Sequence, residues 1–180
     1  MRSYDYSRRT GVRFLTWDDV AALAAGLAEA LHGDGVDLVV GVARAGLIPA
    51  AIVAANLPCE LCPVRVTRRV DDQVRHRSPV WRVPVPTDVR GRRVAVVDEI
   101  ADTGETLAMV AAQAEARGAS HVVTAVLVSH TWASPAPAVA ALVTDALVVF
   151  PWDRRVLVNG EWRPHPELED ALRLQGQGET

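Results

Sequence analysis

The feature that most constrains the fold is the stretch from Val94 to Leu107, which reads VAVVDEIADTGETL. It opens with a run of small, mostly β-branched apolar residues, which is typical of a parallel strand buried on both faces. An acidic segment and a T-G-x-T sequence follow, with Asp98, Glu99, Asp102, Thr103, Gly104 and Thr106. A long helical pattern then begins near Gly104. A strand, a polar turn and a helix N-terminus form an anion site, because free N–H groups and the positive end of the helix dipole point outward.

The residues of this turn also indicate the kind of anion. A Walker-type loop would need GxxxxGK[ST], which the sequence lacks. Carboxylates beside a phosphate-binding turn indicate a ligand with both a phosphate and vicinal hydroxyls, because the acids can accept hydrogen bonds from a ribose diol. The alternative is an ordinary strand–turn–helix of an α/β protein with solvated acids at the turn.

This turn resembles the signature of the type I phosphoribosyltransferases, which is a hydrophobic strand, two acidic residues, a short spacer and T-G-x-T. Asp98 to Thr106 fits the signature without a gap. The resemblance implies that phosphoribosyl diphosphate binds here, at Asp98, Glu99, Ala101, Asp102, Thr103, Gly104, Glu105 and Thr106. It also implies Mg²⁺ as cofactor, with Asp98 and Glu99 as the available carboxylates, since Mg²⁺ prefers phosphate oxygens plus one or two carboxylates.

A second strand–loop–helix unit lies upstream. Residues 37–42 read as a buried strand, residues 43–46 (ARAG) as a loop and residues 47–57 as a helix. In the family this loop binds diphosphate and often contains a cis peptide before its basic residue, which here places that bond at Ala43–Arg44. The resemblance implies diphosphate binding by Ala43, Arg44, Ala45 and Gly46, with Arg44 stabilising the departing diphosphate. Ala45 replaces the first glycine of the family, and the alternative role for Arg44 is a surface charge.

Residues 60–67 read as a strand interrupted by Pro63, which favours an edge position because proline lacks an N–H. The polar segment after it matches the position of the mobile loop that closes over diphosphate in type I enzymes. Its basic residues Arg68, Arg69 and Arg75 are candidate cations for the diphosphate. The alternative is a solvated loop.

Asp102 favours a purine acceptor, because family members that act on 6-oxopurines carry an Asp directly before T-G that exchanges a proton with the imidazole ring of the base. Its alternative role is a turn acid. The Pro151-Trp152-Asp153 triplet matches the same subgroup. The family's stacking aromatic falls on Leu147, and its base-reading lysine is absent near Val128. The candidate base-binding residues are Leu147, Val148, Trp152, Asp153 and His130, with His130 as a donor to the oxo group.

The remaining patterns complete an α/β fold. A capping box at Thr16 precedes an amphipathic helix over residues 17–31, which resembles the opening helix of bacterial xanthine-guanine phosphoribosyltransferases. Further strands are expected at 121–129 and 146–150, with a turn and a short helix between them. A hairpin turning at Asn159-Gly160 and a helix at 166–174 follow. We therefore predict a doubly wound, mainly parallel five-stranded sheet with helices on both faces and a small C-terminal hood.

We expect a flexible basic arm at residues 1–13, a core at 14–150, and a hood and tail at 151–180, all within one domain. The net charge of −3 gives no nucleic-acid footprint, so we expect no nucleic-acid partner. No run is long and apolar enough for a membrane span, and the N-terminus lacks a signal-peptide core, so a cytoplasmic location is expected. Cys59 and Cys62 form a single CxxC without a second ligand pair, which favours inert thiols over a redox or metal site.

The leading functional prediction is a phosphoribosyltransferase that takes phosphoribosyl diphosphate and a free nucleobase, a 6-oxopurine, and works as a homodimer or higher homo-oligomer. One alternative is a regulatory protein that keeps the phosphoribosyl site as a sensor. Another is a transferase acting on a non-purine or modified base.

Overall fold

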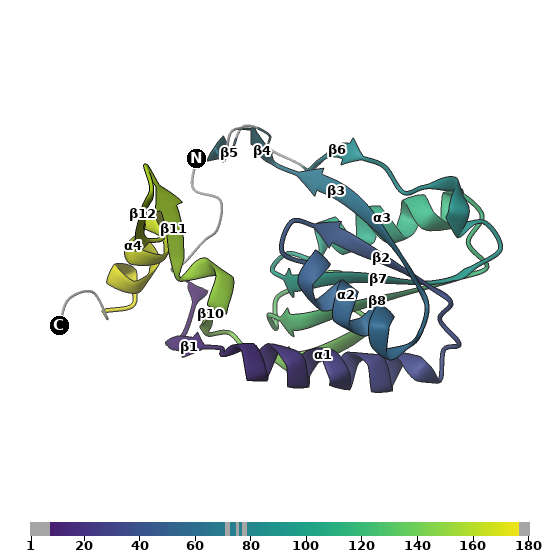
Figure 1. The fold of residues 1–180 in the computed structure, drawn as a ribbon, viewed down its shortest axis with the longest axis horizontal. Helices are drawn as coiled ribbons and strands as arrows, with labels where there is room; N and C mark the ends of the chain where they lie inside the picture. The colour runs from purple at the N-terminus through teal and green to yellow at the C-terminus, as the bar shows by residue number, and fades with distance from the viewer. Residues whose placement is uncertain (1–7, 71–72, 75, 77–78, 177–180) are drawn as a thin grey trace. The chain divides into compact units, whose positions relative to one another are not determined.

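The computed structural model describes residues 8–70, 73–74, 76 and 79–176 (Figure 1). The chain divides into two compact units, one of residues 21–144 and one of residues 2–20 together with 145–180. The first residues of the predicted basic arm, Arg75 and the last residues of the tail lie outside the described residues.

The larger unit is built on a six-stranded sheet with the order β6-β3-β2-β7-β8-β9. These strands are β2 (Leu38–Ala43), β3 (Glu60–Thr67), β6 (Val80–Val83), β7 (Arg93–Ala101), β8 (His121–Ser129) and β9 (Val139–Val143). All neighbours pair in parallel except β3 and β6, which are antiparallel. A short antiparallel pair, β4 (Arg69–Val70) and β5 (Gln73–Val74), follows β3. The predicted mainly parallel sheet is confirmed, with six strands in place of five.

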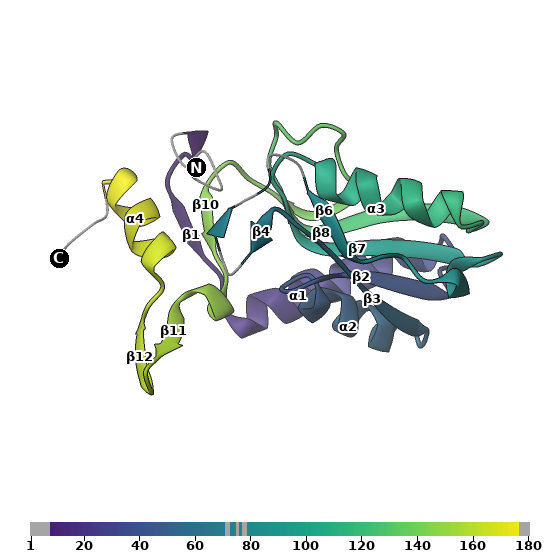
Figure 2. The same cartoon turned by 90° about the horizontal axis from the view of Figure 1, so that it is seen from above.

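Helices cover both faces of this sheet, as predicted. Figure 2 shows α2 (Leu47–Asn56) and the Ala21–His32 part of α1 (Trp17–His32) on one face, and α3 (Glu105–Ala116) on the other. Alternation along β2 explains the arrangement: Val40 and Val42 belong to the core cluster that contains Leu107 and Val110 of α3. Gly41 faces α2 instead, where an added Cβ would lie 2.8 Å from the Ala50 Cβ.

Two sequence predictions about this sheet are wrong. Residues 139–143 form strand β9 rather than a helix, because they pair with β8 from Ala125 to Ser129. The β3 strand is not an edge strand, since β2 and β6 flank it. Pro63 is nevertheless tolerated, because it pairs with Gly41 on the β2 side, while the β6 pairing starts only at Arg65.

The smaller unit is described for residues 8–20 and 145–176. Strand β1 (Val12–Phe14) pairs in parallel with β10 (Leu147–Val149), so residues 12–13 of the predicted flexible arm are in a strand. The predicted fifth strand is thus β10, outside the main sheet, because its partner is β1 rather than β8.

The C-terminal segments of the smaller unit agree with the sequence predictions. The hairpin of β11 (Arg155–Val158) and β12 (Glu161–Pro164) turns at Asn159-Gly160, both with positive φ, and α4 (Pro166–Leu174) follows. Leu147, Val149 and Ala171 of α4 form the core of this unit. No helix among the described residues is long and apolar enough to cross a membrane.

Candidate active site

The turn between β7 and α3 places the acidic residues at the end of the central strand. Strand β7 continues past the predicted segment to Ala101, so Asp98 lies within the sheet, opposite Val126 of β8. Helix α3 begins at Glu105, and Gly104 precedes it in the left-handed region with φ 84°. The Glu105 N–H donates to Thr103 Oγ1 at 3.4 Å. Asp102, Thr103 and Gly104 therefore form a tight turn at a helix N-terminus, which suits an anion.

Asp98 and Glu99 form an acidic pair in which Asp98 is buried and Glu99 half-buried. Asp98 is 8% exposed, and its Oδ1 accepts the Glu99 N–H at 2.9 Å. Burial, and then the neighbouring Glu99 carboxylate, raise the pKa of Asp98 well above its usual range. Glu99 Oε2 is buried and has no hydrogen-bond partner among the described residues. The pair is therefore built to meet a positive charge or a hydroxyl donor.

The loop between β2 and α2 lies against this acidic pair. Strands β2 and β7 are neighbours, with Gly41 opposite Val97. The predicted cis peptide bond at Ala43–Arg44 is present. An added Cβ at Gly46 would lie 2.9 Å from the Asp98 Cα and would also strike the Asp98 carboxylate. The absence of a side chain at Gly46 therefore allows the β2–α2 loop to lie against Asp98.

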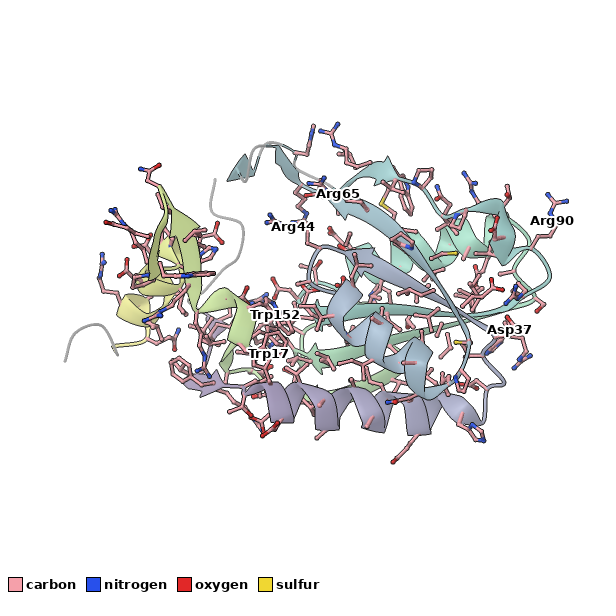
Figure 3. All side chains as sticks on the ribbon, in the orientation of Figure 1. Trp17, Asp37, Arg44, Arg65, Arg90 and Trp152 are labelled. Atoms are coloured by element: carbon pink, nitrogen blue, oxygen red, sulfur yellow. The ribbon has the colours of Figure 1, made fainter. Side chains whose placement is uncertain are left out.

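Arg65 is a candidate that the sequence analysis did not single out. It lies opposite Ala43 in the β2–β3 register, so two arginines, Arg44 and Arg65, stand at the ends of adjacent strands (Figure 3). No sequence signal marks Arg65, because the register between β2 and β3 is known only from the fold. Arg68, from the predicted mobile loop, pairs with Glu105 at the start of α3. Of the other two loop candidates, Arg69 lies in β4, and Arg75 is outside the described residues.

A second segment, residues 130–135, packs on the turn, and the sequence analysis named only His130 of it. The His130 N–H donates to the Ala101 carbonyl at 3.2 Å, and the Ser134 N–H to the Thr103 carbonyl at 3.0 Å. The Trp132 Nε1–H donates to Asp102 Oδ1 at 3.2 Å. An added Cβ at Gly104 would strike the Pro135 carbonyl oxygen. This 130–135 segment therefore lies directly over the turn formed by Asp102, Thr103 and Gly104.

His130, the predicted donor to the purine oxo group, lies directly after β8. It is 2% exposed, and its Nδ1 lies 2.6 Å from the Thr144 carbonyl oxygen. A carbonyl only accepts, so Nδ1 carries a proton and donates it to Thr144. Of the two ring nitrogens of His130, Nδ1 is therefore engaged with the backbone.

The other predicted base-binding residues lie in the smaller unit. Leu147 is 7% exposed and packs in the core with Val149 and Ala171. Trp152 stacks on Phe150 with ring centroids 4.7 Å apart and is tilted against Trp17 at 5.7 Å, as Figure 3 shows for the two tryptophans. Val148 lies in β10, and Asp153 ends the 3₁₀ turn η3 (Pro151–Asp153). Sequence reasoning found the Pro-Trp-Asp triplet but missed its aromatic partners.

The two loops carry an acidic pair, a T-G-x-T turn and a cis peptide bond before an arginine. A known protein family matches most of the chain, including both loops. Residues 13–155 match the family described as phosphoribosyl transferase domain. The chain belongs to this family. The match includes residues of both units.

Individual phosphoribosyltransferases resemble the chain over different lengths. A purine phosphoribosyltransferase structure from Pyrococcus horikoshii is 32% identical with a TM-score of 0.71, covering 82% of this chain and 98% of its own. A xanthine-guanine phosphoribosyltransferase of Cereibacter sphaeroides is 28% identical over 77% of this chain and 85% of its own length. An adenine phosphoribosyltransferase of Mycobacterium avium is 31% identical over 61% of this chain. The chain spans 66% of that enzyme, slightly under two thirds.

The acidic pair fits the magnesium ion that phosphoribosyltransferases use. No group of three or more His, Cys, Asp or Glu side chains suited to a metal occurs in the described part of the chain. Mg²⁺ does not need such a cage, because it keeps waters and takes substrate phosphate oxygens with one or two carboxylates. The unpartnered Glu99 Oε2 beside the buried Asp98 carboxylate provides that kind of donor set.

Proposed function

We propose that this protein is a purine phosphoribosyltransferase that transfers the 5-phosphoribosyl group from phosphoribosyl diphosphate to a 6-oxopurine and releases diphosphate. The observation that carries the proposal is the meeting of the Asp98–Thr106 turn with the Arg44 loop at adjacent strand ends. Ligands of open α/β sheets bind beyond the carboxyl ends of the strands, where both loops lie.

Each part of the site has a role in this proposal. The turn from Thr103 to Thr106 holds the 5′-phosphate at the N-terminus of α3, where the helix dipole favours an anion. Asp98 and Glu99 accept hydrogen bonds from the ribose hydroxyls. Arg44 contacts the diphosphate, and we add Arg65 as a second cation because of its register position. In the transfer, a nitrogen of the base forms a bond to the anomeric carbon, and the bond from that carbon to the diphosphate oxygen breaks.

Charge and proton movements in this step involve two side chains. Diphosphate leaves with the bonding electrons, so the positive charge of Arg44 stabilises the leaving group. The base loses a proton from its imidazole ring, and Asp102 is the carboxylate placed to accept it. Magnesium, when bound to Asp98, Glu99 and the substrate oxygens, supplies charge neutralisation for the departing diphosphate.

The choice of a 6-oxopurine rests on Asp102 before Thr103-Gly104, on the Pro151-Trp152-Asp153 triplet, and on the xanthine-guanine relatives. We propose Asp153 or its neighbouring carbonyls as readers of the purine 2-position. The buried Leu147 and the missing lysine weaken base recognition. Loss of a charged donor to a buried oxo group costs ~1.5–3 kcal/mol, so we expect turnover with a high Michaelis constant.

The test is diphosphate release from phosphoribosyl diphosphate and Mg²⁺ with hypoxanthine, guanine, xanthine, adenine, uracil and orotate. We expect the highest kcat/KM with one of the three oxopurines. Preference for adenine would overturn the oxopurine assignment but keep the purine enzyme, consistent with the adenine-specific relative. Preference for a pyrimidine would refute a purine acceptor. Binding of phosphoribosyl diphosphate without turnover on any base would favour the sensor alternative.

A further inference from the structure

We propose that Trp132 positions Asp102 for proton transfer, and that the stacked pair of Trp132 and His130 serves as its support. The inference rests on the proposed function, since it assigns a residue to the same reaction. Trp132 is a positioning residue here, because its contact is with Asp102 and not with a reacting atom.

The contact is a direct hydrogen bond with Trp132 as donor and Asp102 as acceptor. The Trp132 Nε1–H lies 3.2 Å from Asp102 Oδ1, and an indole can only donate. The two residues are 30 positions apart, so the contact depends on the fold and not on local geometry. A hydrogen bond to one carboxylate oxygen restricts rotation about the Asp102 Cβ–Cγ bond. Trp132 therefore sets the direction in which Asp102 presents its lone pairs.

Other residues of the 130–135 segment hold Trp132 in place. The His130 ring stacks on the indole with centroids 4.6 Å apart and planes 14° from parallel. His130 is 2% exposed and is anchored by its Nδ1–H to the Thr144 carbonyl, directly after β9. Two contacts fix the segment against the turn: the Ser134 N–H bond to the Thr103 carbonyl, and the close approach of the Pro135 carbonyl to Gly104.

This arrangement follows a general requirement of proton transfer. A general base works when a further group orients it and when packing locks that group. Here Asp102 is the base, Trp132 the orienting donor, and His130 the packing partner. The arrangement lies entirely within the larger unit, so it does not depend on how the hood is placed.

The experiment is a double-mutant cycle of Trp132→Phe and Asp102→Asn, with kcat and KM measured for diphosphate release. Phenylalanine keeps an aromatic ring against His130 and removes the donor, together with part of the indole surface. Trp162→Phe is the matched control, because Trp162 is 64% exposed in the β12 hairpin. We expect Trp132→Phe to lower kcat roughly tenfold, the scale of one hydrogen bond to a charged group, with an unchanged KM for phosphoribosyl diphosphate. In the Asp102→Asn background, the same change should have no further effect.

The outcomes separate this inference from the proposed function. An equal loss of kcat in both backgrounds, or an unchanged kcat in Trp132→Phe, would overturn the positioning role while the enzyme assignment stands. A wild-type protein that transfers to no base would refute the proposed function and this role together.

A spectroscopic readout keeps the contact testable if Trp132→Phe fails to fold. The indole N–H resonance of Trp132 should shift upfield in Asp102→Ala, where the acceptor is gone. An unchanged resonance would show that the contact is absent and would overturn the inference.

Discussion

The burial of Asp98 suits the proposed ligand binding and lowers the stability of the ligand-free fold. Its carboxylate is buried beside Glu99, and both effects raise its pKa. A raised folded-state pKa stabilises the fold only at low pH, and this contribution is lost as pH rises through the folded pKa. As the pH rises above the usual carboxylate range, the ligand-free protein therefore loses stability through Asp98. The substitution Asp98→Asn would keep an Oδ1 acceptor for the Glu99 N–H without the charge.

We therefore predict that Asp98→Asn raises the melting temperature of the protein at pH 7 in the presence of chelator. A gain of about 1 kcal/mol corresponds to roughly 2–4 °C in a chain of this size. The gain should shrink as the pH is lowered below the usual carboxylate range. Asp88→Asn, at an exposed position in η2 (Thr87–Val89), is the control. A lower melting temperature for Asp98→Asn at pH 7 would contradict this explanation.

Asp102 is the proposed proton acceptor, so we expect its substitution to lower kcat. Asp102→Asn keeps an oxygen that can accept from Trp132 Nε1 but cannot take up a proton readily. We expect kcat to fall by roughly 10²-fold or more, the usual contribution of general acid–base groups. The affinity for phosphoribosyl diphosphate, measured by calorimetry, should change little. Equal losses of binding and turnover would identify Asp102 as a structural residue of the turn.

At the scale of elements, the start of α3 depends on Gly104. Its φ of 84° lies in the left-handed region, and the Pro135 carbonyl occupies the space where a Cβ would be. Gly26 in α1 is the opposite case, because an added Cβ there would meet no described atom within 4 Å beyond its chain neighbours and the helix's own backbone.

We predict that Gly104→Ala lowers the free energy of unfolding by ~1–2 kcal/mol or more, from backbone strain and the clash with Pro135. Gly26→Ala should raise it by ~0.5–1 kcal/mol. Urea denaturation followed by circular dichroism measures both variants. Similar effects of the two substitutions would mean that the turn does not require glycine.

The capping box of α1 gives a pH-dependent prediction. Asp19 Oδ2 accepts from the Thr16 N–H at 2.8 Å and from its hydroxyl at 2.7 Å, while the Asp19 N–H donates to Thr16 Oγ1. The backbone hydrogen bond from Thr16 lowers the pKa of Asp19. A lowered folded-state pKa gives stability that is present above the unfolded pKa of ~3.9 and is lost as pH falls through the folded value.

We therefore expect the melting temperature of the wild type to fall more steeply below about pH 4 than that of Asp19→Asn. The melting temperature of the neighbouring variant, Asp18→Asn, should fall with pH as steeply as that of the wild type. Parallel melting curves for the wild type and Asp19→Asn over this pH range would show that the box does not stabilise the helix.

The limits of sequence prediction differ between these elements. The Asp98–Thr106 turn could be predicted because its strand, acids and helix start are contiguous. Residues 139–143 could not be assigned securely, because a short apolar run fits a helix or a strand, and only pairing with β8 decides it. The contact of Trp132 with Asp102 has no sequence signal, since it joins two loops through side chains. The pairing of β10 with β1 could not be predicted either, because the sequence pattern of a strand does not specify which strand lies next to it.

At the scale of the whole molecule, the predicted ligand contacts are divided between the two units. The larger unit carries the residues proposed for phosphoribosyl diphosphate and Asp102, the proposed proton acceptor. The smaller unit carries the Pro151-Trp152-Asp153 triplet. The family match extends across both, from residue 13 to residue 155. The phosphoribosyl half keeps the family pattern closely, while the base half departs from it at Leu147 and at the missing lysine. We therefore expect donor binding to be a sharper test of the proposed function than the choice of acceptor.

The most direct test is calorimetric titration of phosphoribosyl diphosphate with Mg²⁺ into the wild type and into the double variant Asp98→Asn/Glu99→Gln. Glu115→Gln, at an exposed position near the far end of α3, is the control. We predict clear binding to the wild type and the control, and a loss of roughly tenfold or more in affinity for the double variant. Undiminished affinity in the double variant would contradict the assignment of this turn as the phosphoribosyl diphosphate site.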